Sequence, residues 1–484
     1  MNKYFYLLLF IPAFAAIFCL FFRGNSKLER KISIFSSFSY ALFALILVFN
    51  FDIPQLVISG AWSKGVGIGL KFDSISAMII SIVGIIYFTG ALYGIPGKTV
   101  EKHRSYQFLY NSLFLGLTGA FLTNDLFNLF VWFEVTLMSS YVLVVLEDED
   151  KRLRGGLKYI ILNFFSGLIF LTSVGLIYAA TKTLDFSELQ IRLLKLYAIN
   201  PGYVVALAFS LFGAFAIKSG FFPFFFWLPE SYPRLSPTLS GVLAGLLTKL
   251  GLYAMIRLFS EVFPFDPTFF HTILVLSTLT LIIGVCGAVI QGSIREILSY
   301  HIISQVGFIG IAVSFSTHSD LNIANFAKGA ALFYIVHHIA VKTNLFFISG
   351  ILLMKKGSEK LSSLSGVIKT QPIIALMFLI PAGSLIGIPP LSGFWAKLSI
   401  FKITIASRYI WVTLFMIAGS FFTLYSMLKI WTQVFLGDVS TTNEYKAVPV
   451  KMGQYLAVVI LCLITLLISF SPSWLYQFSI QGAI

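Results

Sequence analysis

The sequence has little charge and few cysteines. Only 11% of its 484 residues are charged, against roughly 25% in an average soluble domain, so the composition excludes an ordinary soluble enzyme. The three cysteines, Cys19, Cys286 and Cys462, are isolated, and each lies in an apolar segment. Cysteines placed in this way form neither a disulfide framework nor the ligand set of a zinc or iron–sulfur site. We therefore expect no metal, no redox centre and no cofactor in this chain.

A cleavable signal peptide is also not expected. Residues 4–22 form a long apolar stretch, and no small-residue cleavage site follows it. This pattern is typical of a first membrane span rather than of a signal that is removed.

Apolar residues make up 58% of the chain, and the mean hydropathy is +0.90. Apolar windows of about 20 residues, the length at which a helix crosses a ~30 Å hydrocarbon core, recur from end to end. They are far longer than the ~10-residue alternating segments of a membrane β-barrel. We therefore predict an all-α membrane protein. About fourteen transmembrane helices are expected near residues 3–22, 32–51, 74–96, 106–123, 125–146, 157–180, 202–227, 236–257, 269–290, 297–315, 326–353, 372–405 (interrupted), 409–434 and 452–470.

The net charge of +14 is unevenly distributed over the loops. Lys and Arg are roughly twice as frequent in one set of alternate loops, which includes Arg23 and Arg30, and such a bias marks the cytoplasmic side. The poorer set includes Lys71, Arg257 and Lys328. We therefore expect a multi-pass protein of the cell (inner or plasma) membrane with both termini outside, as an even number of spans requires.

Two spans are interrupted by glycine and proline. Residues 218–229 read KSGFFPFFFWLP and residues 387–397 read GIPPLSGFWAK, so both contain a Ser-Gly-Phe triplet with a lysine close by. Gly and Pro are common in membrane helices, but interrupted helices at matching places in two halves indicate an internal repeat with the ion site at the breaks. We predict that spans 4–8 match spans 9–13.

The loops are expected to be short, and the longest are predicted near residues 52–73, 181–201 and 355–371. No separate soluble domain fits between them, so the whole chain is predicted to form one polytopic membrane domain. Its expected parts are the N-terminal spans 1–3 in residues 1–105, the first repeat in 106–260, the second repeat in 265–435 and the last span in 436–484.

Five charged side chains lie in the middle of apolar spans: Glu134, Lys218, Lys249, Lys342 and Lys397. A lysine at the centre of a membrane helix costs roughly 2.5–3.5 kcal/mol on insertion scales. Together, if unpaired, they would cost more than the net stability of most folds. We expect them to face the interior of the bundle, to find partners there and to be retained for function.

Glu134 in the fifth span and Lys218 in the seventh are predicted to form an ion pair in a low dielectric. A purely structural salt bridge is the alternative, although a buried pair is often no more stable than an apolar replacement. If the charge of Glu134 moved toward or away from Lys218, the proton affinity of Lys218 would switch. Such a pair could gate proton transfer.

Two further lysines could continue a polar wire from this pair. Lys249 lies in the middle of the eighth span and Lys342 in the middle of the eleventh, with His338 one turn before it on the same helix face. His301 and His337 are weaker candidates, because a lone histidine in a membrane helix is as often a hydrogen-bonded packing residue as a proton relay.

Residues 123–134, TNDLFNLFVWFE, resemble the fifth-helix motif of the MrpD (MnhD) component of Mrp-type multisubunit Na+/H+ antiporters. This family is homologous to the antiporter-like subunits of respiratory complex I and of membrane-bound hydrogenases. The other family motifs are matched in the same order at residues 156–163, 218–223, 236–249, 338–342 and 387–397. The match covers about residues 70–430 and departs from the family at Asn124, where Gly is usual.

The resemblance implies the same helix count, two inverted five-helix repeats and a central hydrophilic axis. It implies that Glu134 and Lys218 are the family's essential pair, that Lys249 and Lys397 are the central lysines of the eighth and twelfth helices, and that His338 is the eleventh-helix histidine. The residues expected to carry proton translocation are therefore Glu134, Lys218, Lys249, His338, Lys342 and Lys397.

We accordingly expect a proton-translocating subunit of a monovalent cation (Na+ or K+)/proton antiporter, and not an enzyme. The expected partners are the other membrane subunits of the same hetero-oligomeric complex and the lipid bilayer, with protons and Na+ as substrates and no nucleic acid. Asp73 and Asp125 are interpreted as boundary residues, and no acidic cluster looks like a complete Na+ site. Sodium is therefore expected to cross in a partner subunit.

Two other functions stay open at this point. One is a proton-pumping, antiporter-like subunit of a membrane-bound hydrogenase or complex I-related oxidoreductase, where electron transfer elsewhere supplies the energy. Both classes use the same chain of lysines, so the sequence does not separate them. A stand-alone solute permease is the weakest of the three.

Overall fold

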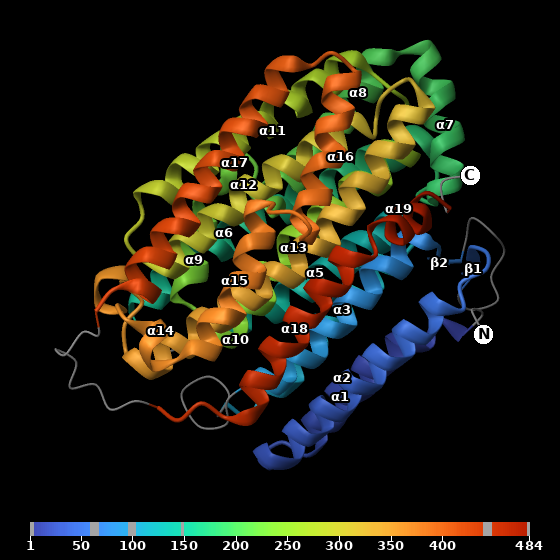
Figure 1. Ribbon diagram of the computed structural model, residues 1–484. Coiled ribbons are helices and arrows are strands. Elements are labelled where there is room, and N and C mark those ends of the chain that lie inside the picture. The colour runs from blue at the N-terminus through green and yellow to red at the C-terminus, as the bar shows by residue number, and fades with distance from the viewer. Residues whose placement is uncertain (1–3, 59–66, 95–102, 147–149, 439–447, 482–484) are drawn as a thin grey trace.

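The computed structural model of the chain describes residues 4–58, 67–94, 103–146, 150–438 and 448–481. Over these ranges the chain forms a bundle of long helices with one short β-hairpin (Figure 1). Eleven helical segments of the described part are long and apolar enough to cross a membrane, and two shorter apolar helices cover Leu7–Phe21 and Pro372–Ile386. The predicted helical membrane fold is confirmed, and within the described residues each predicted span range overlaps helical structure.

The N-terminal part holds the hairpin. Its elements are α1 (Leu7–Phe21), α2 (Ser26–Phe49), β1 (Gln55–Ile58), β2 (Gly69–Phe72), α3 (Ser74–Tyr93) and α4 (Tyr106–Leu122). The two strands pair antiparallel, with Gln55 opposite Phe72. Asp73 comes next and starts α3 through a capping box, because Asp73 and Ser76 each accept the other's backbone N–H with their side chains. We call the end of the bundle that carries β1 and β2, at the right in Figure 1, the hairpin end.

The next part of the chain begins its helices at polar caps. Its elements are α5 (Leu126–Val145), α6 (Asp150–Thr181), α7 (Phe186–Ile199), α8 (Pro201–Ser219), η4 (Phe224–Phe226), α9 (Trp227–Ser231), η5 (Tyr232–Arg234) and α10 (Pro237–Glu261). The side chain of Asp125 accepts the Asn128 N–H at 2.7 Å, and Asn200 caps α8 immediately before Pro201. Such caps satisfy N–H groups that the helix itself leaves free.

The last part contains the longest helix, α13. The elements are α11 (Pro267–Ile290), α12 (Ile294–Phe315), α13 (Leu321–Lys356), η6 (Leu361–Ser363), α14 (Val367–Thr370), α15 (Pro372–Ile386), α16 (Ser392–Ala406), α17 (Ile410–Ile430), η7 (Trp431–Leu436), α18 (Met452–Phe470) and α19 (Pro472–Gln481). Lys355 and Lys356 lie in the last turn of α13, where basic side chains favour the negative end of the helix dipole.

The stretches predicted as long loops contain regular structure. The hairpin occupies part of 52–73, α7 part of 181–201, and η6 with α14 part of 355–371. Helix α7 was missed because it has only 14 residues and five of them are polar or charged: Ser187, Glu188, Gln190, Arg192 and Lys195. A window average over such a helix does not reach the hydropathy of a span.

Both predicted helix interruptions are confirmed. Helix α8 ends at Gly220 with φ 77° and α15 ends at Gly387 with φ 95°. This left-handed conformation favours glycine, because a side chain there would clash with the backbone. At Gly220 a Cβ would also collide with the side chain of Leu228. The chain resumes as α9 after the first break and as α16 after the second.

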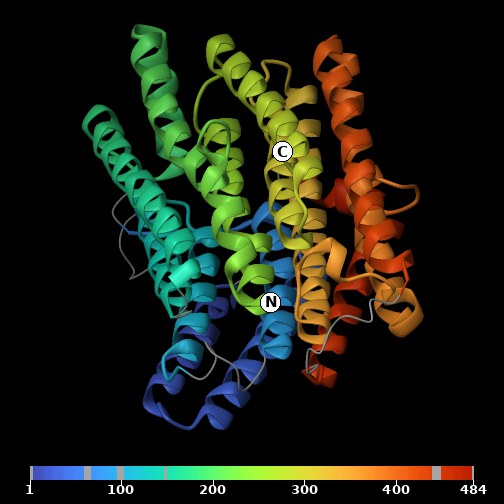
Figure 2. The ribbon, with the colours of Figure 1, turned by 90° about the vertical axis from the view of Figure 1, so that its left-hand side faces the viewer.

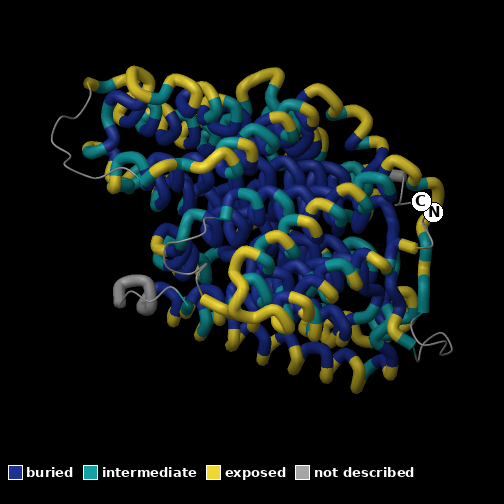
Figure 3. The backbone as a smooth tube through the Cα atoms, turned by 90° about the horizontal axis from the view of Figure 1, so that it is seen from below, coloured by how far each residue is buried: buried dark blue, intermediate teal, exposed yellow. Residues whose placement is uncertain are grey.

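The centre of the bundle is formed by α3, α10, α12 and α13. In α10 and α13 the most apolar 18-residue window is entirely buried. Figure 2 shows the green helices of the first half on one side, the orange helices of the last part on the other and the yellow helices between them. Buried backbone fills the middle of the bundle and exposed backbone its margins (Figure 3). The exposed side chains of the outer helices include Phe35, Phe165, Leu414 and Phe421, as expected of a surface that contacts lipid.

Candidate functional site

The helices that carry the predicted site residues are neighbours in the bundle. Helix α6 packs on α5 and α8, α8 packs on α10, α10 packs on α13, and α13 packs on α16. Along this series lie Glu134 on α5, Lys218 on α8, Lys249 on α10, His338 and Lys342 on α13, and Lys397 on α16. The four lysines and His338 are buried, and Glu134 is half-buried. The fold thus places the six residues on consecutive packed helices.

Glu134 and Lys218 do not form the predicted ion pair in this structure. No oxygen of Glu134 lies within 4.0 Å of the Lys218 ammonium, and Oε1 of Glu134 and Nζ of Lys218 are both buried without a hydrogen-bond partner. Nζ of Lys218 instead lies 5.3 Å from the centre of the Phe133 ring, a cation–π geometry. Glu134 points to α6, where a Cβ added at Gly167 would lie 2.8 Å from Oε1. Sequence spacing identified the right helices but could not fix the side-chain conformers.

The other three lysines donate hydrogen bonds to main-chain carbonyls. Nζ of Lys249 donates to Ala244 O at 2.7 Å, Nζ of Lys342 to Leu298 O at 3.0 Å, and Nζ of Lys397 to Ile386 O at 2.8 Å. An ammonium has three donors, and a carbonyl oxygen leaves a lysine free to exchange a proton with another group. Lys397 also lies 5.0 Å from the centre of the Phe308 ring and binds the carbonyl at the broken end of α15.

The histidines lie between these lysines. His338 is fully buried, and neither of its ring nitrogens has a hydrogen-bond partner. Nδ1 of His337 lies 2.8 Å from Oγ of Ser392 and 3.4 Å from Oγ of Ser384, while its Nε2 has no partner. Nε2 of His301 lies 2.6 Å from Oγ of Ser426. His337 is therefore bonded to the interruption between α15 and α16.

The serines around His337 were missed by the sequence reasoning. Oγ of Ser384 lies 2.8 Å from Oγ of Ser392 and accepts the backbone N–H of Gly393 at 3.2 Å. A Cβ at Gly393 would collide with the Ser384 carbonyl, so glycine permits this close contact. Ser392 belongs to the Ser-Gly-Phe triplet that indicated the helix break, and that triplet was the sequence signal from which a role for this serine could have been predicted.

Several buried polar atoms without a partner lie on the helices that carry this series of residues. Such atoms in native proteins are normally satisfied by the protein or by ordered water. Besides Glu134 and Lys218, the set includes Ser219 Oγ, Thr248 Oγ1, His301 Nδ1, His337 Nε2, His338 Nδ1 and Nε2, and Asn344 Oδ1. The interior is therefore polar along the axis on which the lysines lie.

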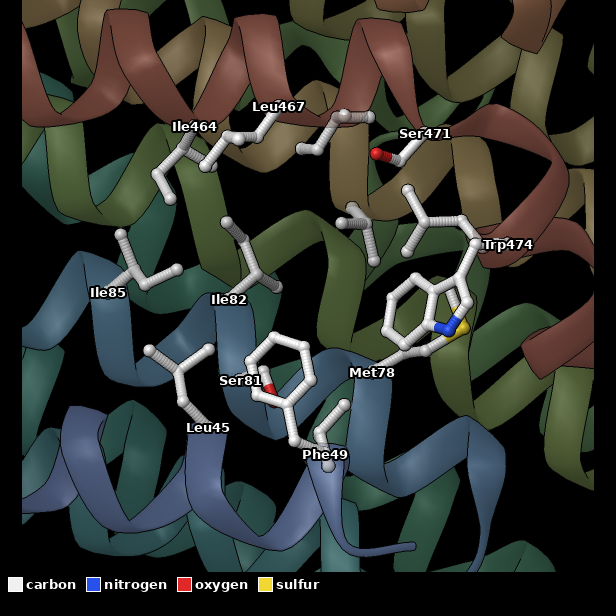
Figure 4. Close-up of a pocket in the computed structure, with 14 residues that line it drawn as sticks. Leu45, Phe49, Met78, Ser81, Ile82, Ile85, Ile464, Leu467, Ser471 and Trp474 are labelled. Carbon is white, nitrogen blue, oxygen red and sulfur yellow. The ribbon is translucent and has the colours of Figure 1, made fainter.

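An apolar groove of about 410 Å³ lies between α2, α3 and the C-terminal helices α18 and α19 (Figure 4). Leu45, Ile82, Leu467 and Trp474 line it, and none of its lining residues is charged. The groove contains none of the six predicted site residues. Its chemistry suits hydrocarbon and not ions.

The two aspartates interpreted as boundary residues are helix caps in the structure. Asp125 caps α5, and Asp73 caps α3. Asp73 is also buried and bound to Arg257. The expectation that Arg257 and Lys328 are loop cations is wrong, because both lie inside helices and both are buried.

Comparisons with known proteins agree with the motifs. The family model described as "NADH:quinone oxidoreductase/Mrp antiporter, TM" matches residues 123–423. A Na(+)/H(+) antiporter subunit of Alkalihalophilus pseudofirmus is 37% identical, and the aligned region covers 100% of this chain and 97% of the relative. The antiporter subunit of the same name from Bacillus subtilis is 34% identical, and the aligned region again covers 100% of this chain and 97% of the relative.

Solved structures show the same fold. A chain of the Mrp complex from Dietzia sp. superposes with a TM-score of 0.91 at 27% identity, covering 100% of this chain and 97% of that one. A chain of an archaeal membrane-bound sulfane sulfur reductase superposes with a TM-score of 0.89 at 24% identity, and the superposition covers 100% of this chain and 97% of that one. At that identity the second likeness concerns the fold alone.

Proposed function

Because the chain belongs to the NADH:quinone oxidoreductase/Mrp antiporter family, we propose that it is the proton-translocating subunit of a multisubunit monovalent cation/proton antiporter. The observation that supports this function is the series of packed helices carrying Glu134, Lys218, Lys249, Lys342 and Lys397. None of the four lysines has a carboxylate within 4.0 Å in the described part of the chain. Protons are the cations that such a row of ammonium groups can pass on, since a row of positive charges repels Na+.

The first step of the proposed path is a switch between Glu134 and Lys218. In the conformer seen here the two groups are apart, with Glu134 against α6 and Lys218 over the Phe133 ring. When the Glu134 side chain turns toward α8, its negative charge holds the proton on Lys218 more tightly. When it turns back, Lys218 releases the proton toward Lys249. The arrangement seen here, with the two groups apart, is one of the two states that this switch requires.

The second step crosses from α10 to α13. These helices pack closely, because Gly245 on α10 lies directly against the side chain of Thr343 on α13. His338 lies one turn from Lys342 and has two unpartnered ring nitrogens. We propose that water bridges Lys249, His338 and Lys342 and passes protons between them.

The last step ends at the second helix break. Lys397 binds the carbonyl of Ile386, and His337 is bonded to Ser384 and Ser392 at the same break. A movement of α16 relative to α15 would change both sets of bonds together. We propose this break as the point at which protons exchange with the second half-channel, with His337 as an additional relay.

We propose about fourteen membrane crossings, with α4, α1 and the α15–α16 pair added to the eleven segments of sufficient length. Residues 106–260 and 265–435 would form the two inverted repeats, between the N-terminal spans in 1–105 and the last span in 436–484. We propose that the hairpin end lies outside together with both termini, and the bias of Lys and Arg in the loops supports this orientation. The coupling cation, Na+ or K+, would cross in another membrane protein of the complex.

The test is transport by the assembled complex in inverted membrane vesicles. Glu134→Ala and Lys218→Ala are each expected to abolish Na+-coupled proton movement while the complex still assembles. Glu188→Ala is the matched control, because it removes a partly exposed carboxylate on α7, a helix that carries none of the six site residues. Full transport in either site variant would refute the mechanism.

The alternative is a proton pump driven by electron transfer in a larger complex. The full-length relatives that are named antiporter subunits, at 37% and 34% identity, favour the antiporter. Purification of the native complex discriminates between them. Small membrane subunits without iron–sulfur clusters would support the antiporter, and co-purifying clusters, nickel or flavin would support the redox-driven pump.

A further inference from the structure

One face of α10 carries a polar stripe from the centre of the bundle to the hairpin end. Lys249, Tyr253, Arg257 and Glu261 follow one another at four-residue spacing, so they lie above one another on the same helix face. Tyr253 and Arg257 are buried, and Glu261 lies at the end of the helix. The stripe is a direct route along α10 from Lys249 to the hairpin end.

Arg257 closes this route. Its two terminal nitrogens bind the two carboxylate oxygens of Asp73 at the start of α3. Its Nε donates to the Tyr253 hydroxyl at 3.0 Å, and Nη1 also donates to Glu261 at 3.3 Å. The Tyr253 hydroxyl in turn donates to Phe121 O at 2.8 Å. The guanidinium is therefore anchored on three sides in a buried position.

Further charges surround the pair at the hairpin end. Lys328 on α13 lies 3.1 Å from Glu261, and Lys71 on β2 lies 3.2 Å from Asp73 and 3.9 Å from Glu261. Three cations thus face two carboxylates, which leaves a net charge of +1. Cations that approach from this end meet a positive cluster.

The cluster differs from the lysine series in how its polar atoms are satisfied. Of the side chains that the structure describes here, Asp73, Tyr253, Arg257 and Glu261 have no buried nitrogen or oxygen atom without a partner. Along the lysine series, by contrast, several such atoms are unpartnered, including those of Lys218 and His338. Since water enters a protein where polar atoms need partners, the side chains of the cluster need less water than the lysine series, although Oγ of the neighbouring Ser74 has no partner.

We propose that Arg257 is the insulating residue of the transport path: with Asp73, Tyr253 and Glu261 it forms a dry, positively charged plug that keeps external ions from reaching Lys249 along α10. A guanidinium does not lose its proton in proteins, so Arg257 cannot relay protons, and its charge repels cations in a narrow passage. The plug forces protons to pass sideways between helices, where movement can be coupled to the cation. This inference rests on the proposed function, because a plug matters only if Lys249 carries protons.

Arg257→Lys is the decisive variant. A lysine keeps the positive charge and can pair with Asp73, so a cluster that only clamps α10 to α3 would stay proton-tight. A buried lysine can lose its proton, so the same change should turn the plug into a relay. Arg192→Lys on α7 is the matched control, since Arg192 pairs with Glu188 at 3.7 Å in a half-exposed position.

The measurement is proton leak in proteoliposomes that contain the whole complex, after an acid pulse and without Na+ or K+ exchange. Arg257→Lys is expected to leak several-fold faster than the wild type, and the charge-balanced variant Asp73→Asn with Arg257→Gln at least as fast. Arg192→Lys should match the wild type. Assembled Arg257→Lys complex that is as proton-tight as the wild type would overturn the proposal.

A milder variant decides the matter if Arg257→Lys prevents assembly. Tyr253→Phe keeps every ion pair and removes only the hydroxyl that holds Nε of Arg257, so a leak above that of the wild type is expected. Tyr93→Phe is its control, because the Tyr93 hydroxyl also donates to a main-chain carbonyl, that of Phe347, at 2.8 Å. If Tyr253→Phe is proton-tight and Arg257→Lys does not assemble, the cluster is a structural clamp and the inference is wrong.

The two proposals fail in different assays. Retained Na+-coupled transport in Glu134→Ala or Lys218→Ala would refute the proton path. An unchanged passive leak in the Arg257 variants would refute the plug and leave the proton path standing.

Discussion

Gly167 on α6 gives direct access to the conformer of Glu134. A Cβ added there would lie 2.8 Å from Oε1 of Glu134, well inside the roughly 3.5–4.0 Å at which non-bonded atoms pack best. The atom that must yield is the end of a flexible side chain and not backbone. Gly167→Ala should therefore displace the carboxylate from α6 without distorting the helices.

The expected effect on stability is small and favourable. Alanine in the interior of a helix is roughly 0.5–1 kcal/mol better than glycine, and displacement of the Glu134 side chain offsets part of this gain. Gly175→Ala is the matched control on the same helix, since no atom lies within 4 Å of its added Cβ. Both variants should assemble as well as the wild type and unfold at or slightly above its Tm.

The expected effect on transport is large by comparison. Two opposite charges 4 Å apart attract each other by about 4 kcal/mol at an effective dielectric constant of 20. A carboxylate that cannot return to α6 stays near Lys218, and biasing the switch by only about 1.4 kcal/mol slows it tenfold. Gly167→Ala should therefore lower Na+-coupled proton transport about tenfold.

The assay is initial-rate transport in inverted vesicles with equal amounts of assembled complex. Gly175→Ala should transport at the wild-type rate. If Gly167→Ala transports as fast as Gly175→Ala at equal stability, the position of Glu134 against α6 has no role in the switch.

Two further predictions concern residues outside the pair. The carboxyl group of Asp73 is buried, which alone would raise its pKa, but the pairing with Arg257 and Lys71 holds this pKa below its usual range. The stabilisation that the ionised Asp73 gives the fold is therefore present at neutral pH, and it is lost as the pH falls through the acid range below about 4. Asp73→Asn should destabilise the protein by about 3–5 kcal/mol at neutral pH, because it removes the closer of the two carboxylates that pair with the buried Arg257. It should also flatten the acid limb of a Tm-against-pH curve, and an unchanged acid limb would contradict this. Ser392→Ala removes one partner of His337 and should slow transport without loss of assembled complex, and wild-type transport would show that the serine does not position the histidine.

The sequence predicted the helices and the breaks well, because both depend on local chemistry. A span needs a continuous apolar run, and the breaks at Gly220 and Gly387 need glycine in a left-handed conformation. The order of the site helices was also predictable, since the six residues lie in motifs that follow one another along the chain. Helix α7 was missed because it is short and polar residues interrupt its apolar run.

Contacts between distant segments could not be predicted in the same way. The pairing of Asp73 with Arg257 joins residues 184 positions apart, and no local pattern signals it. Charge counting assigned Arg257 to a loop, because an arginine close to a helix end looks like a flanking residue. The predicted contact between Glu134 and Lys218 failed for the opposite reason: the helices were right, but rotamers within a bundle are set by packing partners such as Phe133 and Gly167.

Two pairs of buried charges differ in how their polar atoms are satisfied. Arg257 and Asp73 bind each other and have further partners, and a satisfied pair in the interior holds helices together and resists movement. Lys218 and Glu134 are left unsatisfied, which costs free energy that a structural role would not explain. Unsatisfied groups are stabilised by any movement that brings water or a hydrogen-bond partner to them. They are therefore the groups that can alternate between two conformers. The plug at the hairpin end and the switch at the centre thus follow from one criterion, the presence or absence of partners for buried charge.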